Sequence, residues 1–176
     1  GLAMLRASVF MGYFAFLPLY LTAEGISISM VGATLFVFGL SSGLGGLTAG
    51  FWAENLGEKN LLYLSYLLPF PLCSGYLLAS TSLEGLVCLG VAGYALSSGI
   101  PVVISMGQRS FPKRRGAISS VLMGGSWGAA ALLITPAGII AEQVGIYAVL
   151  WGFTLSSIFG FILANVLFQR RIVTPV

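Results

Sequence analysis

The sequence predicts an all-α integral membrane protein in which residues 1–176 form a single bundle of six transmembrane helices. The composition is the first observation behind this fold class: 57% of the 176 residues are hydrophobic and only 7% are charged. A water-soluble domain carries about 25% charged residues. The second observation is that the apolar runs are long and show no period-two alternation, which disfavours a membrane β-barrel. We therefore expect the lipid bilayer to cover most of the surface.

Breaks in the apolar pattern divide the chain into six segments, each long enough to cross a bilayer core, which takes about 20 helical residues. In chain order these segments are 2–22, 27–53, 60–79, 85–108, 114–141 and 144–168. The interruptions are short, which predicts antiparallel neighbours. They contain nearly every charged residue, in this order: Glu24; Glu54, Glu58 and Lys59; Glu84; Arg109 to Arg115; Glu142; Arg170 and Arg171.

The distribution of Lys and Arg predicts the orientation of the bundle. With six helices, all 8 cations fall on the side that holds both termini. They are Arg6, Lys59, Arg109, Lys113, Arg114, Arg115, Arg170 and Arg171. The opposite side has none of them and carries Glu24, Glu84 and Glu142. Because cytoplasmic loops are enriched in Lys and Arg, we expect a multi-pass protein of the plasma (cell inner) membrane with both termini in the cytoplasm.

A short internal repeat relates the two halves of the chain. The pattern Gly-x-x-Ala-Glu-amide-aliphatic-Gly begins at Gly50 and recurs at Gly138, half a chain later. It predicts two three-helix units, about 1–83 and 84–176. Since three is an odd number of crossings, the units would be inverted relative to each other, an arrangement typical of secondary transporters. The alternative is a common helix ending, because Gly suits the position after a helix.

Several kinds of chemistry are excluded by the residues that the chain lacks. There is no His, so no imidazole is present for metal ligation or for a Ser-His-Asp triad. Two Gly-x-Ser-x-Gly strings, around Ser41 and Ser126, therefore do not indicate a hydrolase. A nucleotide-binding Gly-x-x-x-x-Gly-Lys loop is also missing. From these absences we expect no enzyme activity, no metal and no cofactor. We also expect no nucleic-acid partner, because the cations lie at helix ends, where membrane topology explains them.

The stretch from Gly50 through Glu54, Asn55 and Gly57 to Lys59 resembles the cytoplasmic signature of the major facilitator superfamily. That signature reads Gly-x-x-x-Asp-Arg/Lys-x-Gly-x-Arg/Lys-Arg/Lys, and the sequence departs from it where Asn55 and Asn60 replace cations. Further stretches that fit are Phe16 to Leu21, Pro101 to Gln108, Gly124 to Gly128, and Pro136 to Gly138. Together they resemble most the carboxyl-terminal half of fosmidomycin-resistance-type exporters.

This resemblance implies helices seven to twelve of a twelve-helix transporter. The start at Gly1 rather than Met agrees with that expectation. The partner would be a missing amino-terminal six-helix half or a second copy of the chain. The implied function is secondary active transport of a small molecule by alternating access, as proton-coupled efflux of a drug or organic anion, hence antibiotic resistance. The alternative is a six-helix membrane scaffold or subunit without transport activity.

Five residues are candidates for a substrate pathway: Arg6, Tyr13, Tyr94, Ser98 and Trp127. Arg6 has two interpretations. It either extends to the cytoplasmic interface, or lies deeper in the membrane and binds a substrate or counter-ion. The other four are polar-edged groups at mid-membrane depth, for which core packing is equally expected. No helix has an acidic residue at its middle, so any proton carrier is expected in the other half.

A second set of candidates belongs to the motif between the second and third helices. The predicted cytoplasmic gate comprises Gly50, Glu54, Gly57, Lys59 and Arg109, with a possible ion pair between Glu54 and Arg109; the alternative is two solvated charges. Small residues predict close helix packing. These packing candidates are Gly39, Gly43, Gly46, Gly124, Gly128, Pro136 and Gly138.

Overall fold

The computed structural model describes residues 2–79 and 82–173. Within these ranges the chain is helical and has no strand. The elements are α1 (Leu2–Ala23), α2 (Ile28–Leu56), α3 (Glu58–Leu67), α4 (Pro69–Ala79), α5 (Leu83–Ser110), a 3₁₀ turn η1 (Pro112–Arg114), α6 (Arg115–Ser120), a π-helical turn η2 (Val121–Gly125), α7 (Ser126–Val144) and α8 (Ile146–Val173). In the described part of the chain, they combine into 6 helical stretches long and apolar enough to cross a membrane. The predicted six-span, all-α fold class is thereby confirmed.

Two of the six spans are interrupted within the membrane. The third span divides at Leu68, directly before Pro69, because proline has no amide hydrogen and its ring displaces the preceding turn. The fifth span runs from Pro112 to Val144. It passes from η1 through α6 and the π-helical turn η2 into α7. Interruptions of this kind are tolerated in membranes where neighbouring groups satisfy the freed backbone.

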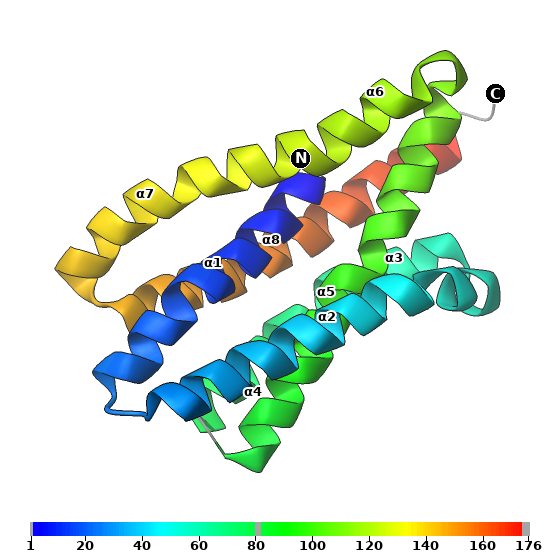
Figure 1. The fold of residues 1–176 in the computed structure, drawn as a ribbon. Helices are drawn as coiled ribbons and strands as arrows, with labels where there is room; N and C mark the ends of the chain where they lie inside the picture. The colour runs from blue at the N-terminus through cyan, green and yellow to red at the C-terminus, as the bar shows by residue number, and fades with distance from the viewer. Residues whose placement is uncertain (1, 80–81, 174–176) are drawn as a thin grey trace.

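The spans pack in two groups (Figure 1). In one group α1 packs against α7 and α8, and in the other α5 packs against α2, α3 and α4. The first span thus packs on the fifth and sixth, and the fourth on the second and third, so each packed group combines spans from both predicted three-helix units. The boundary between the units near residue 83 stays a prediction, and residues 1, 80–81 and 174–176 lie outside the described ranges.

The repeated motif ends on equivalent backbone turns. Gly57 alone joins α2 to α3, with φ of 80° and ψ of 143°, and Gly145 alone joins α7 to α8, with φ of 92° and ψ of 151°. Both glycines have a positive φ, which side chains strongly disfavour. The two junctions lie at opposite ends of the bundle (Figure 1).

Several helix ends differ from the predicted boundaries. Helix α2 continues to Leu56, about a turn beyond the predicted end at Ala53, so Glu54 is helical rather than in a loop. Ser27 and Ser82 precede their helices as N-caps, each accepting a hydrogen bond from a backbone amide. The single-residue junctions explain the longer helices, because one glycine with positive φ reverses the chain without a loop.

The predicted glycine ladder of α2 does not face α5 in this structure, and its role in helix packing stays a prediction. A Cβ at Gly43 or Gly46 would meet none of the described atoms within 4 Å, whereas a Cβ at Gly45 would lie 2.2 Å from the Tyr94 carbonyl oxygen. The face of α2 that meets α5 is Phe38, Ser42, Gly45 and Ala49, all buried. Sequence spacing found the small residues but assigned the contact to the adjacent face.

The packing glycines predicted in the fifth span are likewise open. A Cβ added at Gly124, Gly128 or Gly138 would have no described atom within 4 Å. In α2, by contrast, a Cβ added at Gly39 would make ordinary contact with Phe14. The reason is that the fifth span is the least buried of the six candidate spans in the described chain, at 11%. Pro136 lies in a groove of about 460 Å³ between α1, α7 and α8.

Candidate functional site

Arg6 is a buried cation at mid-membrane depth. Its side chain is 7% exposed and its Nη1 donates to the Leu96 carbonyl oxygen at 3.2 Å. Leu96 is close to the middle of α5, which runs from Leu83 to Ser110. Of the two interpretations of the sequence, the structure therefore supports the deeper position over extension to the membrane surface. Within the described chain, Arg6 Nε has no hydrogen-bond partner.

A small cavity lies beside this cation and is called the Arg6 cavity below. It has a volume of about 40 Å³ and is lined by residues of α1, α5 and α7: Arg6, Ala7, Phe10, Leu96, Ser97, Ile100 and Trp127. Trp127 is near the middle of the fifth span, directly after the π-helical turn η2. The Trp127 and Phe10 rings are 5.6 Å apart, centroid to centroid. The cavity thus combines one uncompensated charge with an aromatic wall.

The other predicted pathway residues lie outside the Arg6 cavity. Tyr13 is fully buried and its hydroxyl is 2.6 Å from Thr154 Oγ1 of α8. Tyr94 is hydrogen-bonded to Thr48 and Trp52 of α2. Ser98 is buried and donates to the carbonyl oxygen of its own helix at Ala95. The structure thus brings together Arg6 and Trp127 at the Arg6 cavity, and Tyr94 and Ser98 at a separate groove of about 190 Å³. The role of these residues in a pathway stays a prediction.

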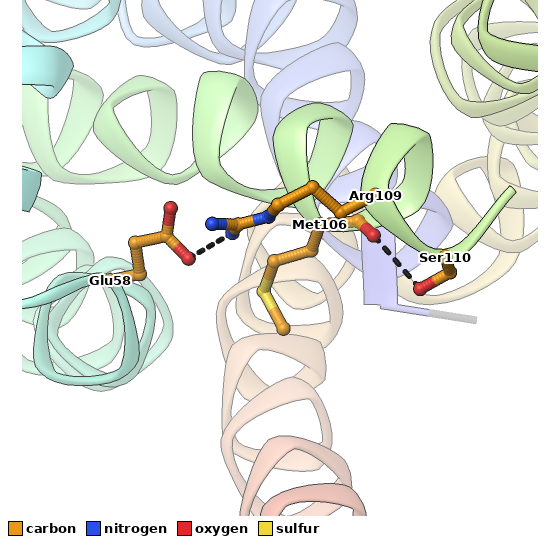
Figure 2. A network of polar contacts seen from close by, with 4 residues as sticks. All are labelled: Glu58, Met106, Arg109 and Ser110. Carbon is orange, nitrogen blue, oxygen red and sulfur yellow. Dashed lines mark hydrogen bonds and ion pairs between the residues drawn. The ribbon is translucent and has the colours of Figure 1, made fainter. Parts of the chain in front are cut away.

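An ion pair joins the α2–α3 junction to the end of α5. Arg109 Nη2 donates to Glu58 Oε2, and Figure 2 shows Arg109 reaching from the last turn of α5 toward Glu58. In the same turn, the Ser110 hydroxyl donates to the Met106 carbonyl oxygen at 2.9 Å (Figure 2). The Arg109 side chain is 59% exposed and that of Glu58 is 36% exposed. Such an accessible pair contributes little to stability and can open at small cost.

This pair corrects the predicted partner of Arg109. The candidate was Glu54, which lies on the last turns of α2 and is exposed. The turn at Gly57 places Glu58 at the start of α3, and Glu58 is the carboxylate that meets Arg109. Lys59, the next gate candidate, lies over the Tyr63 ring at 5.6 Å from its centroid.

Three polar residues of the site were not predicted. Ser97 rather than Ser98 lines the Arg6 cavity. Tyr66 of α3 lies close enough to Arg6 to interact electrostatically, yet its buried hydroxyl has no hydrogen-bond partner among the described residues. Glu58 was visible in the motif as the residue following Gly57. Ser97 and Tyr66 carry no local sequence signal, because their role depends on which face of a uniformly apolar helix meets α1.

The architecture and site define a polytopic helical membrane protein with a buried charge inside its bundle. A family model described as the Major Facilitator Superfamily matches residues 1–175. The chain belongs to this superfamily of membrane transporters. Searches of curated proteins and of solved structures found no match. The membership confirms the superfamily resemblance noted in the sequence.

Proposed function

We propose that this chain is half of a secondary active transporter that moves a small molecule by alternating access, as proton-coupled efflux of a drug or organic anion. The observation that carries the proposal is Arg6, an uncompensated cation buried at mid-membrane depth beside a cavity formed by three spans. An ionisable residue in this position marks a substrate or ion pathway by default. Membership of the Major Facilitator Superfamily supports transport as the activity.

The proposed complete transporter pairs these six helices with six others, either an amino-terminal half of the same protein or a second copy of the chain. The resemblance to fosmidomycin-resistance-type exporters favours the carboxyl-terminal half. All five Glu residues lie at span ends, so the proton-binding carboxylate of a coupled mechanism is assigned to the other half. The membrane is the plasma (inner) membrane, with the Arg109 end in the cytoplasm.

The Glu58–Arg109 ion pair is the proposed cytoplasmic gate. It holds the α2–α3 junction against the end of α5, and separation of these ends would open the bundle on that side. Because the pair is half exposed and energetically small, it suits a contact that forms and breaks during each cycle. Two motif glycines precede Glu58 in the chain: Gly50 lies in α2, and Gly57 forms the turn between α2 and α3.

Loss of the Glu58 carboxylate tests the gate without knowledge of the substrate. Ile100, which lines the Arg6 cavity, becomes the reporter as Ile100→Cys in an intact protein whose Cys73 and Cys88 are replaced by Ala. We expect Glu58→Gln to increase the rate of Ile100→Cys labelling by a membrane-impermeant maleimide from the Arg109 side. Glu54→Gln is the matched control and should leave the rate unchanged. Equal labelling rates in the Glu58→Gln and Glu54→Gln variants would reject the Glu58–Arg109 pair as a gate.

Transport itself is tested in proteoliposomes that contain the intact protein and a pH-sensitive dye. Fosmidomycin, ethidium and glucose serve as anionic, cationic and neutral probes across an imposed pH gradient. Proton movement that depends on a probe and on the protein supports coupled transport. If none of the three moves protons, coupled transport is rejected and the scaffold alternative gains support.

A further inference from the structure

We propose that the Arg6 cavity binds an oxyanion of carboxylate size, borne by a transported molecule whose remainder is apolar or aromatic. This inference rests on the proposed function and names the substrate class of the same site. It draws on the charge balance of the bundle, the unpartnered Nε of Arg6, and the size and lining of the cavity.

Among the described residues, the charge of Arg6 has no carboxylate near it. The five Glu residues lie at the ends of spans, namely Glu24, Glu54, Glu58, Glu84 and Glu142. Arg6 lies instead at the depth of Leu96, whose carbonyl oxygen accepts one of its donors. A carbonyl dipole offsets only part of the cost of a buried cation, which otherwise requires an anion. The bundle therefore contains a positive site without an anion of its own.

One buried donor of this site is without an acceptor in the described structure. It is Arg6 Nε. The hydroxyl of Tyr66 lies close enough to Arg6 to interact with it, but Tyr66 does not line the cavity. Most buried polar groups in proteins have a hydrogen-bond partner, so each exception requires an explanation. An oxyanion accepts several hydrogen bonds at once, and one in the cavity would offset the Arg6 charge and accept a hydrogen bond from its unpaired Nε.

The size and lining of the cavity restrict the ligand further. A volume of about 40 Å³ corresponds to roughly three water-sized groups, which is the size of a carboxylate and too small for a whole drug-sized molecule. Ser97 adds a hydroxyl, and the remaining lining is apolar, with Phe10 and Trp127 as its aromatic members. The arrangement suits the charged end of a molecule whose body lies along the aromatic wall.

Benzoate and benzamide test the inference because they share one shape and differ in charge. Their affinities for the intact, detergent-purified protein would be measured by isothermal titration calorimetry. We expect benzoate to bind about tenfold more tightly, the ratio given by one charge-assisted hydrogen bond. Arg6→Gln should lower the benzoate affinity to that of benzamide and leave the benzamide affinity unchanged. Arg109→Gln removes an exposed cation instead and should retain the tenfold ratio.

Three outcomes would overturn the inference: equal affinities in the unmodified protein, no binding of either compound, or a ratio that survives Arg6→Gln. The wild-type ratio requires no variant, so the test holds even if Arg6→Gln fails to fold. Arg6-dependent benzoate binding without probe-driven proton movement would reject the proposed function alone, whereas proton movement without an anion preference would reject this inference alone.

Discussion

At the scale of single residues, depth in the membrane decides what a polar side chain does. Arg6 is near the start of α1, where the sequence alone permits extension to the membrane surface. Its depth becomes evident only through Leu96, a partner 90 residues away in the chain. The choice between Glu54 and Glu58 is similar, because both carboxylates adjoin the same turn and the backbone at Gly57 selects Glu58. Sequence identified the residue types, and long-range packing determined their partners.

Tyr13 is expected to stabilise the bundle rather than contact a substrate. Its hydroxyl joins α1 to α8 through Thr154, whose own hydroxyl also donates to the Leu150 carbonyl oxygen at 2.9 Å. Tyr13→Phe should therefore lower the free energy of unfolding by about 1 kcal/mol, the typical value of one hydrogen bond. Chemical unfolding of the purified protein measures this change. Tyr147→Phe, at a ring that is 39% exposed, is the control and should have a smaller effect. A changed benzoate-to-benzamide ratio in Tyr13→Phe would contradict a structural role.

At the scale of helices, the number and extent of the spans could be predicted because hydropathy and charge are local properties. The six predicted segments correspond one to one with the six observed spans. The contact faces could not be predicted, because a helix that is apolar all round gives no periodic signal for its packed side. Helix α2 illustrates this, since its packed face includes Gly45 while the regular ladder through Gly43 and Gly46 lies open.

Adjacent glycines of α2 provide a direct test of this face. An added methyl at Gly45 would overlap the Tyr94 backbone, which cannot move without shifting α5. Gly45→Ala should destabilise the protein by about 1–3 kcal/mol, as overpacking does. Gly46→Ala meets open space and should be neutral or slightly stabilising. Melting temperatures of the two variants in one detergent give the comparison, and similar values would show that the α2–α5 contact is wrongly assigned.

The π-helical turn η2 is expected to act as a hinge of the fifth span. It contains Gly124 and Gly125 and ends two residues before Trp127, which lines the Arg6 cavity. Alanine fits at both positions, since the nearest described atom to either built Cβ is 3.8 Å away. Alanine also favours regular helix by ~1 kcal/mol per residue. Gly124→Ala with Gly125→Ala should therefore preserve or raise stability while slowing transport.

Proteoliposome flux and melting temperature together test this hinge. Gly138→Ala is the matched control, because it lies in the same span, has open space around it and is remote from the turn. We expect the control to transport at the unmodified rate. Flux that is unchanged in the double variant would show that the π-helical turn is a static feature.

At the scale of the whole molecule, the bundle separates charge by side. Glu58 and Arg109 meet at one end, where Lys113, Arg114 and Arg115 follow α5. At the opposite end Tyr20 of α1 stacks near Tyr147 of α8, with ring centroids 5.6 Å apart. This sidedness was predictable from sequence, since with an even number of spans seven of the 8 cations fall at span ends on one side. Arg6 is the exception, because the structure buries it at the depth of Leu96. The sequence did not predict the two packed groups, because each of them combines spans from both of the predicted units, 1–83 and 84–176.

The orientation of this charge separation can be measured with two engineered cysteines, one at each end. Ser110 is exposed at the cationic end and Ser29 is exposed at the opposite end. In a background without Cys73 and Cys88, we expect a membrane-impermeant maleimide to label Ser29→Cys in intact cells. Ser110→Cys should be labelled only after the cells are broken, because the cationic end is retained in the cytoplasm. Labelling of Ser110→Cys in intact cells would reverse the orientation and move the Glu58–Arg109 gate to the outer side. Labelling of both positions from outside would contradict the odd number of crossings between them and the alternating-access mechanism that depends on it.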